Sequence, residues 1–211
     1  MPPANWPSTL TELANDVMDL YGEDQLFTDI LTDTTDNGKI LRRMMYRIIR
    51  ECQAEFVWPE LRALATIADP DAGFDNSGGE YPFTYRYDLP EDYLRPYNEH
   101  LYEYEIIGQY IYANVAENLD FHYIKYTETV SDWSPQLYQV ILYKLAHASC
   151  LQITQAQQLK NDIYAEFKSD VLPNAKRIKS SSQKYPNKRH RIQGNYSKSR
   201  RNFSGESGFF R

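Results

Sequence analysis

The chain has 211 residues, of which 42% are hydrophobic, and its formal net charge is −6. This composition is sufficient to bury a core in one large domain or two small ones. No run approaches the roughly eighteen apolar residues of a membrane span, and residues 1–16 hold neither a basic nor an apolar region. We therefore expect neither a transmembrane anchor nor a signal peptide.

The charge is divided sharply along the chain. From Lys176 onward there are eleven Lys and Arg residues against a single acid, Glu206, so this segment carries +10. The residues before it hold 12 basic and 28 acidic side chains, a balance of −16. The two parts are expected to seek different surroundings.

Two amphipathic helices are predicted in the first 60 residues. Apolar residues recur at three- and four-residue steps from 10 to 21, after the cap candidates Ser8 and Thr9 and before Gly22. A second apolar stripe covers 40–56, after a turn signal at 34–39. This helix is expected to end at Trp58, because Pro59 disfavours helical backbone at the residue before it.

Residues 61–130 are rich in Tyr, Ile, Thr and Phe, with turn formers between the runs, which predicts antiparallel strands. Gly108 and Gln109 mark a hairpin turn, and 68–82 is predicted to be a mobile loop. In 81–89, aromatic residues occupy every second position, as in a half-buried strand that ends before Pro90. We expect this aromatic face to pack either against a neighbouring subunit or within its own core; it comprises Tyr81, Phe83, Tyr85 and Tyr87.

Helical patterns return after residue 132. Ser134 and Pro135 suit the cap and first turn of a helix, and a further helix covers about 156–171, where Pro173 ends or kinks it. From Ser180 the sequence is polar and basic and cannot bury enough apolar area to order itself.

These patterns predict an α+β fold, a helical bundle with an antiparallel β module inserted between its second and third helices, followed by an extended C-terminal arm. The expected parts are N-terminal bundle helices at 1–60, the β module at 61–131, C-terminal bundle helices at 132–179 and the basic tail at 180–211.

Few residues are arranged as a chemical site would require. His147 and Cys150 stand one helical turn apart and are the closest approach to a base and nucleophile, without a third member nearby. The acid pairs Glu91/Asp92 and Glu103/Glu105 fit a solvated turn and a solvated strand face. Because no metal-ligand spacing and no phosphate loop occurs, we expect a protein without enzymatic activity, metal or cofactor.

The basic segment is the strongest binding signal, because Lys and Arg interleaved with aromatic residues can engage an acidic surface and then gain order. The alternative interpretation is a solvated, disordered end. The residues predicted to bind a partner are Lys176, Arg177, Lys179, Lys184, Lys188, Arg189, Arg191, Lys198, Arg200, Arg201, Phe209 and Phe210.

Several short motifs follow one another within about 36–172. An aromatic strand leads into a Leu-Pro-x-Asp turn and a Leu-Arg pair, then a Tyr-x-Ile-x-Gly hairpin, a Tyr-Ile strand and a Pro-initiated helix. The motif residues are Trp58, Leu89, Pro90, Asp92, Leu94, Arg95, Tyr104, Ile106, Gly108, Tyr123, Ile124, Trp133, Pro135, Leu145, Ala146, Ile153 and Thr154. This order resembles the tail tubular protein A family of short-tailed bacteriophages, the adaptor between portal and tail nozzle. The basic tail has no counterpart in this pattern.

The resemblance implies a structural virion protein, made in the host cytoplasm and located at the head-tail junction. Twelve copies would form a ring on the portal protein, with the nozzle protein below and tail fibres at the side. Genomic DNA would pass through the lumen without sequence-specific binding, and no membrane is involved. An acidic body suits such a channel, because carboxylates repel phosphate.

Two other functions stay open from the residues alone. The first is a nucleic-acid-binding protein that acts through the basic C-terminal arm. The second is a hydrolase built on His147 and Cys150.

Overall fold

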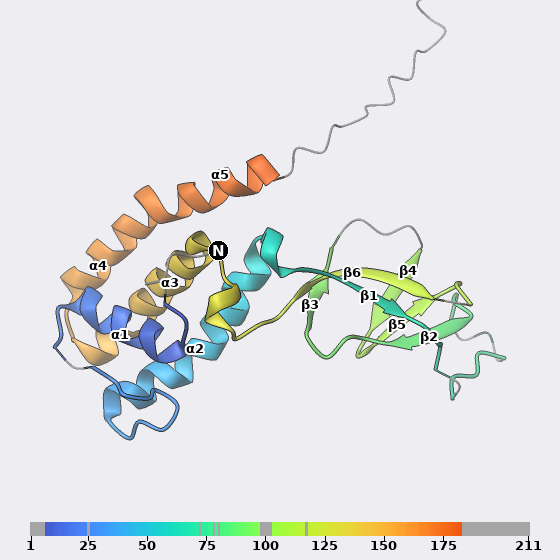
Figure 1. The fold of residues 1–211 in the computed structure, drawn as a ribbon, viewed down its shortest axis with the longest axis horizontal. Coiled ribbons are helices and arrows are strands. Elements are labelled where there is room, and N and C mark those ends of the chain that lie inside the picture. Colours follow the sequence, from blue (N-terminus) through green and yellow to red (C-terminus); the bar gives the residue numbers. More distant parts are fainter. Residues whose placement is uncertain are drawn as a thin grey trace, which may run out of the picture.

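The computed structural model describes residues 7–24, 26–71, 73–77, 79, 81–97, 103–116 and 118–182, with the backbone alone given for 178–182. Two lobes lie side by side along the longest axis of the molecule, one helical and one made of strands (Figure 1). The strands lie between the second and third helices in the chain, which confirms the predicted α+β plan. The helices are α1 (Leu10–Tyr21), α2 (Asp36–Glu55), α3 (Pro135–Ile153), α4 (Gln157–Glu166) and α5 (Leu172–Ser182).

The predicted helix caps are present. Thr9 begins α1 in a capping box, its side chain accepting from the Glu12 backbone N–H while the Glu12 carboxylate accepts from the Thr9 N–H. Gly22 ends this helix at φ 71°, a left-handed conformation that glycine adopts without steric cost. Helix α2 begins at Asp36, inside the expected turn signal, because Thr35 caps it. Ser134 caps α3 by accepting from the Leu137 N–H.

The helix that follows α3 does not end before Pro173. A π turn at Phe167–Val171 joins α4 to α5, and the Leu172 N–H donates to the carbonyl of Phe167, five residues back. The hydrogen-bond register therefore widens immediately before Pro173, which has no N–H to donate. Ala175, beyond the proline, is buried in the bundle core, so packing favours continuing the helix. The helix runs to Ser182, past the point where the tail was predicted to begin.

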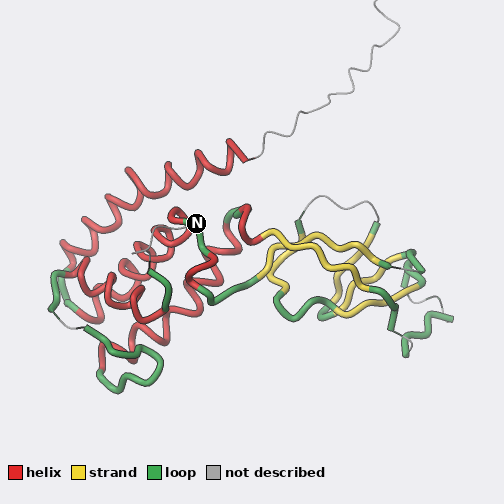
Figure 2. The backbone as a smooth tube through the Cα atoms, in the orientation of Figure 1, coloured by secondary structure: helices red, strands yellow, loops and turns green. Residues whose placement is uncertain are grey.

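Two three-stranded antiparallel sheets form the β module (Figure 2). Sheet A has the order β1-β6-β3, and sheet B the order β2-β5-β4. Gly108, at φ 64°, lies in the predicted tight turn between the last two strands of sheet B. The strands are β1 (Arg62–Ile67), β2 (Tyr85–Asp88), β3 (Tyr93–Pro96), β4 (Tyr104–Ile107), β5 (Tyr110–Ala113) and β6 (Leu119–Lys125).

Two strand predictions need correction. The strand expected over 81–89 is shorter, because β2 begins only at Tyr85. Strand β3 was not predicted at all; it is four residues long, and a register shift between Tyr93 and Arg95 interrupts its pairing with β6. A short strand with a bulge has too little alternation to be recognised from sequence.

Strand β6 contributes to both hydrophobic cores. Phe121 and Tyr123 point between the sheets and join Tyr87 of β2 in the core of the β module. Ile124, the next residue, points the other way and is fully buried in the core of the helical bundle. Successive side chains of a strand face opposite sides, so one strand links both lobes.

Polar contacts fix the junction between the lobes. Gln53 of α2 is fully buried; its amide donates to the carbonyl of Thr127 (2.7 Å) and accepts from the Thr127 N–H (3.1 Å). Trp133 Nε1 donates to the same carbonyl, and Glu60 accepts from the Ser134 N–H. The segments that enter and leave the β module are therefore tied to each other and to α2.

None of the described helices combines the length and the apolar character that crossing a bilayer requires.

Replacing Gln53 with Leu should lower the free energy of unfolding by about 1–3 kcal/mol, because the Thr127 N–H loses its acceptor inside the junction. Urea denaturation followed by circular dichroism measures this. Gln139→Leu, at an exposed position of α3, is the matched control and should change stability by less than about 0.5 kcal/mol. Equal effects of the two substitutions would contradict the role given to Gln53.

Candidate partner-binding surfaces

The aromatic row predicted as a sheet interface is divided between two locations. Tyr87 is fully buried between the sheets, where its hydroxyl donates to the carbonyl of Val115, and Tyr85 packs against the same core. For these two residues, packing within the chain's own core is the arrangement found, and Tyr87 cannot contact a neighbour. Tyr81 and Phe83 precede β2 and are half-buried, so a contact with another subunit stays a prediction for them.

The loop before β2 lies on the outer face of sheet B, although it was expected to be mobile. Tyr81 stacks on Tyr112 of β5 at 4.9 Å between ring centroids, and Phe74 meets the same ring edge-on. The guanidinium of Arg86 lies 5.0 Å from the Phe74 ring and also forms an ion pair with Asp71. The described residues of this loop are thus held by aromatic and charged contacts.

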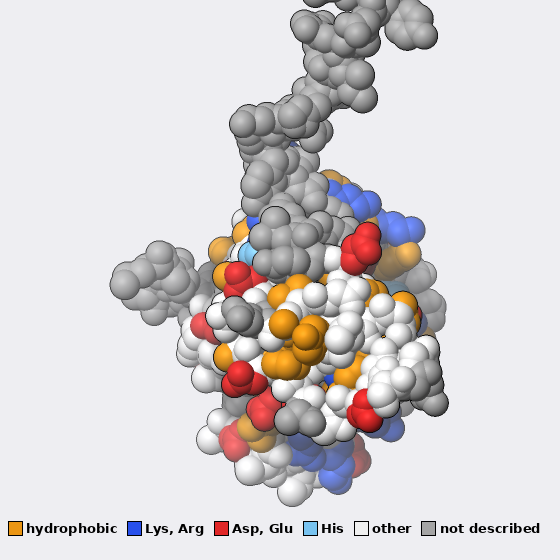
Figure 3. Space-filling model, turned by 90° about the vertical axis from the view of Figure 1, so that its right-hand side faces the viewer, with side chains coloured by type: hydrophobic (Ala, Val, Ile, Leu, Met, Phe, Trp, Pro, Cys, Tyr) orange, Lys and Arg blue, Asp and Glu red, His pale blue; other side chains and the backbone are white. Residues whose placement is uncertain are grey.

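The end of the β module that carries this loop is shown in Figure 3. Hydrophobic side chains gather near the middle of this face, and Asp and Glu side chains are scattered around them. Asp69 and Asp75, which belong to the loop before β2, are exposed.

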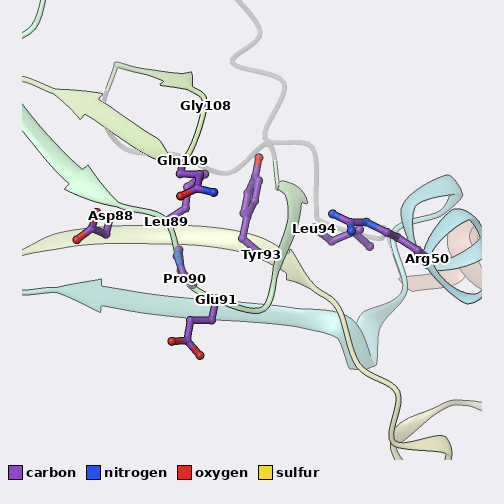
Figure 4. Close-up of a pocket in the computed structure, with 9 residues that line it drawn as sticks. All are labelled: Arg50, Asp88, Leu89, Pro90, Glu91, Tyr93, Leu94, Gly108 and Gln109. Atoms are coloured by element: carbon purple, nitrogen blue, oxygen red, sulfur yellow. The ribbon is translucent and has the colours of Figure 1, made fainter. Parts of the chain in front are cut away.

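A groove of about 730 Å³ lies where the β module meets the helical lobe. The 89–91 turn, the 108–109 hairpin turn and Arg50 of α2 line it, and Tyr93 stands between the two turns (Figure 4). Arg50 reaches from its helix toward Leu94, whereas the Glu91 carboxylate points away from the hairpin turn. The lining includes side chains of both charges, Arg50 on one side and Asp88 and Glu91 on the other.

Backbone hydrogen bonds fix the two turns that line this groove. The Leu89 N–H donates to the carbonyl of Gln109 (3.0 Å), and the Tyr93 N–H closes the proline turn on the carbonyl of Pro90 (3.0 Å). Asp92, within that turn, accepts from the Tyr123 hydroxyl (2.7 Å). The Leu-Pro-x-Asp motif therefore anchors the turn to sheet A and to the hairpin of sheet B.

Three arginines near this junction were not singled out as site residues from the sequence. Arg50, Arg62 and Arg95 form no ion pair with any other residue in the described ranges. Arg62 lies over the ring of Tyr97, 4.7 Å from its centroid. The alternation of residues in 62–67 could have indicated which face of its strand Arg62 lies on. Arg95, two strands away in the same sheet, belongs to β3, which the sequence did not predict.

The predicted basic arm falls largely outside the described residues. Lys176 and Arg177 are exposed on α5, and the backbone of Lys179 belongs to the same helix. The other predicted arm residues, from Lys184 to Phe210, lie beyond the part of the chain that the structure describes.

The structure does not bring His147 and Cys150 together. The His147 ring stacks on Tyr164 at 4.9 Å, and burial lowers its pKa, with a further contribution from the charge of Lys160. Cys150 is fully buried, with its sulfur 3.4 Å from the hydroxyl of Thr154. Burial raises the pKa of the other thiol, Cys52, to about 12, so that sulfur stays protonated at neutral pH.

The acidic pairs occupy surface positions. Glu91, Glu103 and Glu105 are exposed, and Asp92 is engaged by Tyr123 as described. Within the described ranges, His, Cys, Asp and Glu form no group of three or more that could hold a metal ion.

Neither a scan of known protein-family models nor a search of curated proteins found a match to this chain.

The tyrosines around the groove predict sensitivity to alkaline pH. Burial raises the pKa of Tyr93 and Tyr123 to about 12, above their ordinary value of 10.0. Their contribution to stability is present below pH 10 and is lost as the pH rises toward 12, because the unfolded chain releases these protons first. Urea midpoints measured from pH 8.5 to 11.5 should therefore fall above about pH 10, and Tyr93→Phe should reduce the fall. A midpoint that stays level over this range would contradict the burial of these hydroxyls.

Proposed function

We propose that this chain is a structural virion protein of a short-tailed bacteriophage, an adaptor that forms a ring between the portal and the tail nozzle. The observation that carries the proposal is the agreement between motif order and structural elements. The Leu-Pro-x-Asp motif is a turn between β2 and β3, Gly108 turns the next hairpin, Tyr123 and Ile124 lie on β6, and Pro135 begins α3. These are the roles that the family pattern assigns to such residues.

The charge distribution supports the same proposal. A ring made of bodies that carry −16 each would line a channel with carboxylates, through which DNA passes without adhering. The +10 segment from Lys176 leaves the bundle at its C-terminal helix, on which Lys176 and Arg177 are exposed. In this proposal it would bind an acidic surface on the portal or on an adjacent subunit, and it would gain order on binding. Tail fibres and the nozzle protein would contact other parts of the ring.

A second candidate function rests on that same segment. A cationic arm with interleaved aromatic residues is also suited to nucleic acid, in which case the binding would weaken steeply with salt.

Truncation after Lys179 separates the two proposals. As an adaptor, the full-length chain should bind its portal protein, and truncation should weaken this binding about tenfold or more, which is about 1.4 kcal/mol. The mass of the mixture, measured by native mass spectrometry, reports the complex. A chain with Lys and Arg after residue 179 replaced by Gln is the control for tail length and should behave like the truncated form.

Failure of the full-length chain to associate with the portal in any stoichiometry would contradict the adaptor proposal. Salt-sensitive binding of duplex DNA by the full-length chain, abolished by the truncation, would favour the second candidate function.

A further inference from the structure

The two outer faces of the β module carry opposite charges. In sheet A, Arg62 of β1 and Arg95 of β3 are both paired with Ile124 of β6, so the three residues form one row across the sheet. Residues in register on neighbouring strands share a face. Ile124 points away from the space between the sheets, and the two arginines therefore lie on the outer face.

These arginines have unused hydrogen-bonding capacity. Nε and Nη2 of Arg62 and Nε of Arg95 are buried and have no acceptor among the described residues. Arg62 and Arg95 are each partly exposed as whole residues. The row is about 10 Å wide at the Cα atoms, since adjacent strands are about 4.8 Å apart, so the two arginines can face two separate carboxylates of one partner surface.

The outer face of sheet A also exposes an aliphatic side chain. Leu64, two residues beyond Arg62 on the same face, is 55% exposed. The acid of this face, Asp120, accepts from the hydroxyl of Thr66 at the far end of the strands. The exposed Leu64 therefore lies one row beyond the two arginines, whereas Ile124, between them, is covered by the helical bundle.

Sheet B presents the complementary pattern. Ile107 of β4 is 40% exposed and lies in one row with Tyr110 and Asp88, and Glu105 lies in the next row. Their inward neighbours, Ile106 and Ile111, pack in the core, so these residues face outward. Asp88 and Glu105 are both exposed, and the basic residue of this face, Arg86, is already paired with Asp71.

We propose that the outer face of sheet A binds the outer face of sheet B of a second copy of this chain, with Leu64 against Ile107 and with Arg62 and Arg95 on Asp88 and Glu105. The two surfaces differ and lie on opposite sides of one module. Such a head-to-tail contact repeats from copy to copy and closes into a ring when the rotation allows. This interface rests on the proposed ring and specifies how its subunits meet.

Cysteine cross-linking of the full chain tests the interface directly. With a short bismaleimide linker, a mixture of Leu64→Cys and Ile107→Cys chains should give a covalent dimer, and the double variant should give a ladder of oligomers. The native Cys52 and Cys150 are both fully buried, so the wild-type chain serves as the unlinked control. Each single variant alone should give no cross-linked dimer, because the proposed contact never brings the same face of two copies together.

Charge reversal supplies an independent arm of the test. Asp88→Lys with Glu105→Lys, at exposed positions that leave folding unchanged, should reduce the 64–107 product at least about tenfold, an amount equal to 1.4 kcal/mol. Placing Arg62→Glu and Arg95→Glu on the Leu64→Cys chain should restore the product, since the two reversed faces are again complementary. Arg47→Glu, on an exposed part of α2, is the matched control for the arginine changes and should leave the yield unaltered.

The outcomes separate this inference from the adaptor proposal. Absence of the 64–107 product at high protein concentration, or a dimer from Leu64→Cys alone, would overturn the interface even if the chain binds the portal. A ladder from a chain that does not bind the portal would support the interface and contradict the adaptor proposal.

Discussion

The position of the whole β module depends on the polar junction built around Gln53. An inserted module enters and leaves its host domain at one place, and here the leaving segment is held by the buried amide that bonds both backbone groups of Thr127. Trp133 and Glu60 add hydrogen bonds to the same segments. Because Ile124 is buried in the bundle on the same strand that fills the β core, movement of either lobe would disturb both cores.

This junction has a consequence for function. It leaves exposed positions on both sides of the small module, Leu64 on sheet A and Ile107 on sheet B. Ile124, on the face of sheet A that meets the helical lobe, is covered by the bundle, and Phe74 and Tyr81 cover Tyr112 on sheet B. The charges divide the chain elsewhere, between an acidic part that includes both lobes and a basic segment that begins on α5. In the proposed adaptor, the chain would act through geometry and electrostatics, with its arginines as contacts for carboxylates.

Local signals were the part of the fold that the sequence predicted well. Thr9, Gly22 and Ser134 act within one helical turn of themselves, and so their roles follow from short patterns. Contacts between distant segments were not predictable in this way. The strand expected at 81–89 is shortened because Tyr81 instead stacks on Tyr112, thirty-one residues away, and the helix continues past Pro173 because Ala175 is buried in the bundle.

The candidate surfaces show the same limit. The basic arm is evident from composition. The placement of Arg62 and Arg95 in one row, by contrast, depends on the register of β1 and β3 with β6. One of these strands, β3, is too short and irregular to be recognised from sequence, so no pattern could place the two arginines in one row. Burial of Tyr87 likewise follows from how the two sheets face each other, which alternation alone leaves open.

A density map of the assembled particle tests the central claim most directly. The account predicts a ring of these chains between the portal and the nozzle, with the β modules of adjacent copies in contact through opposite faces. A map that places the polypeptide away from the vertex through which the genome leaves would contradict it.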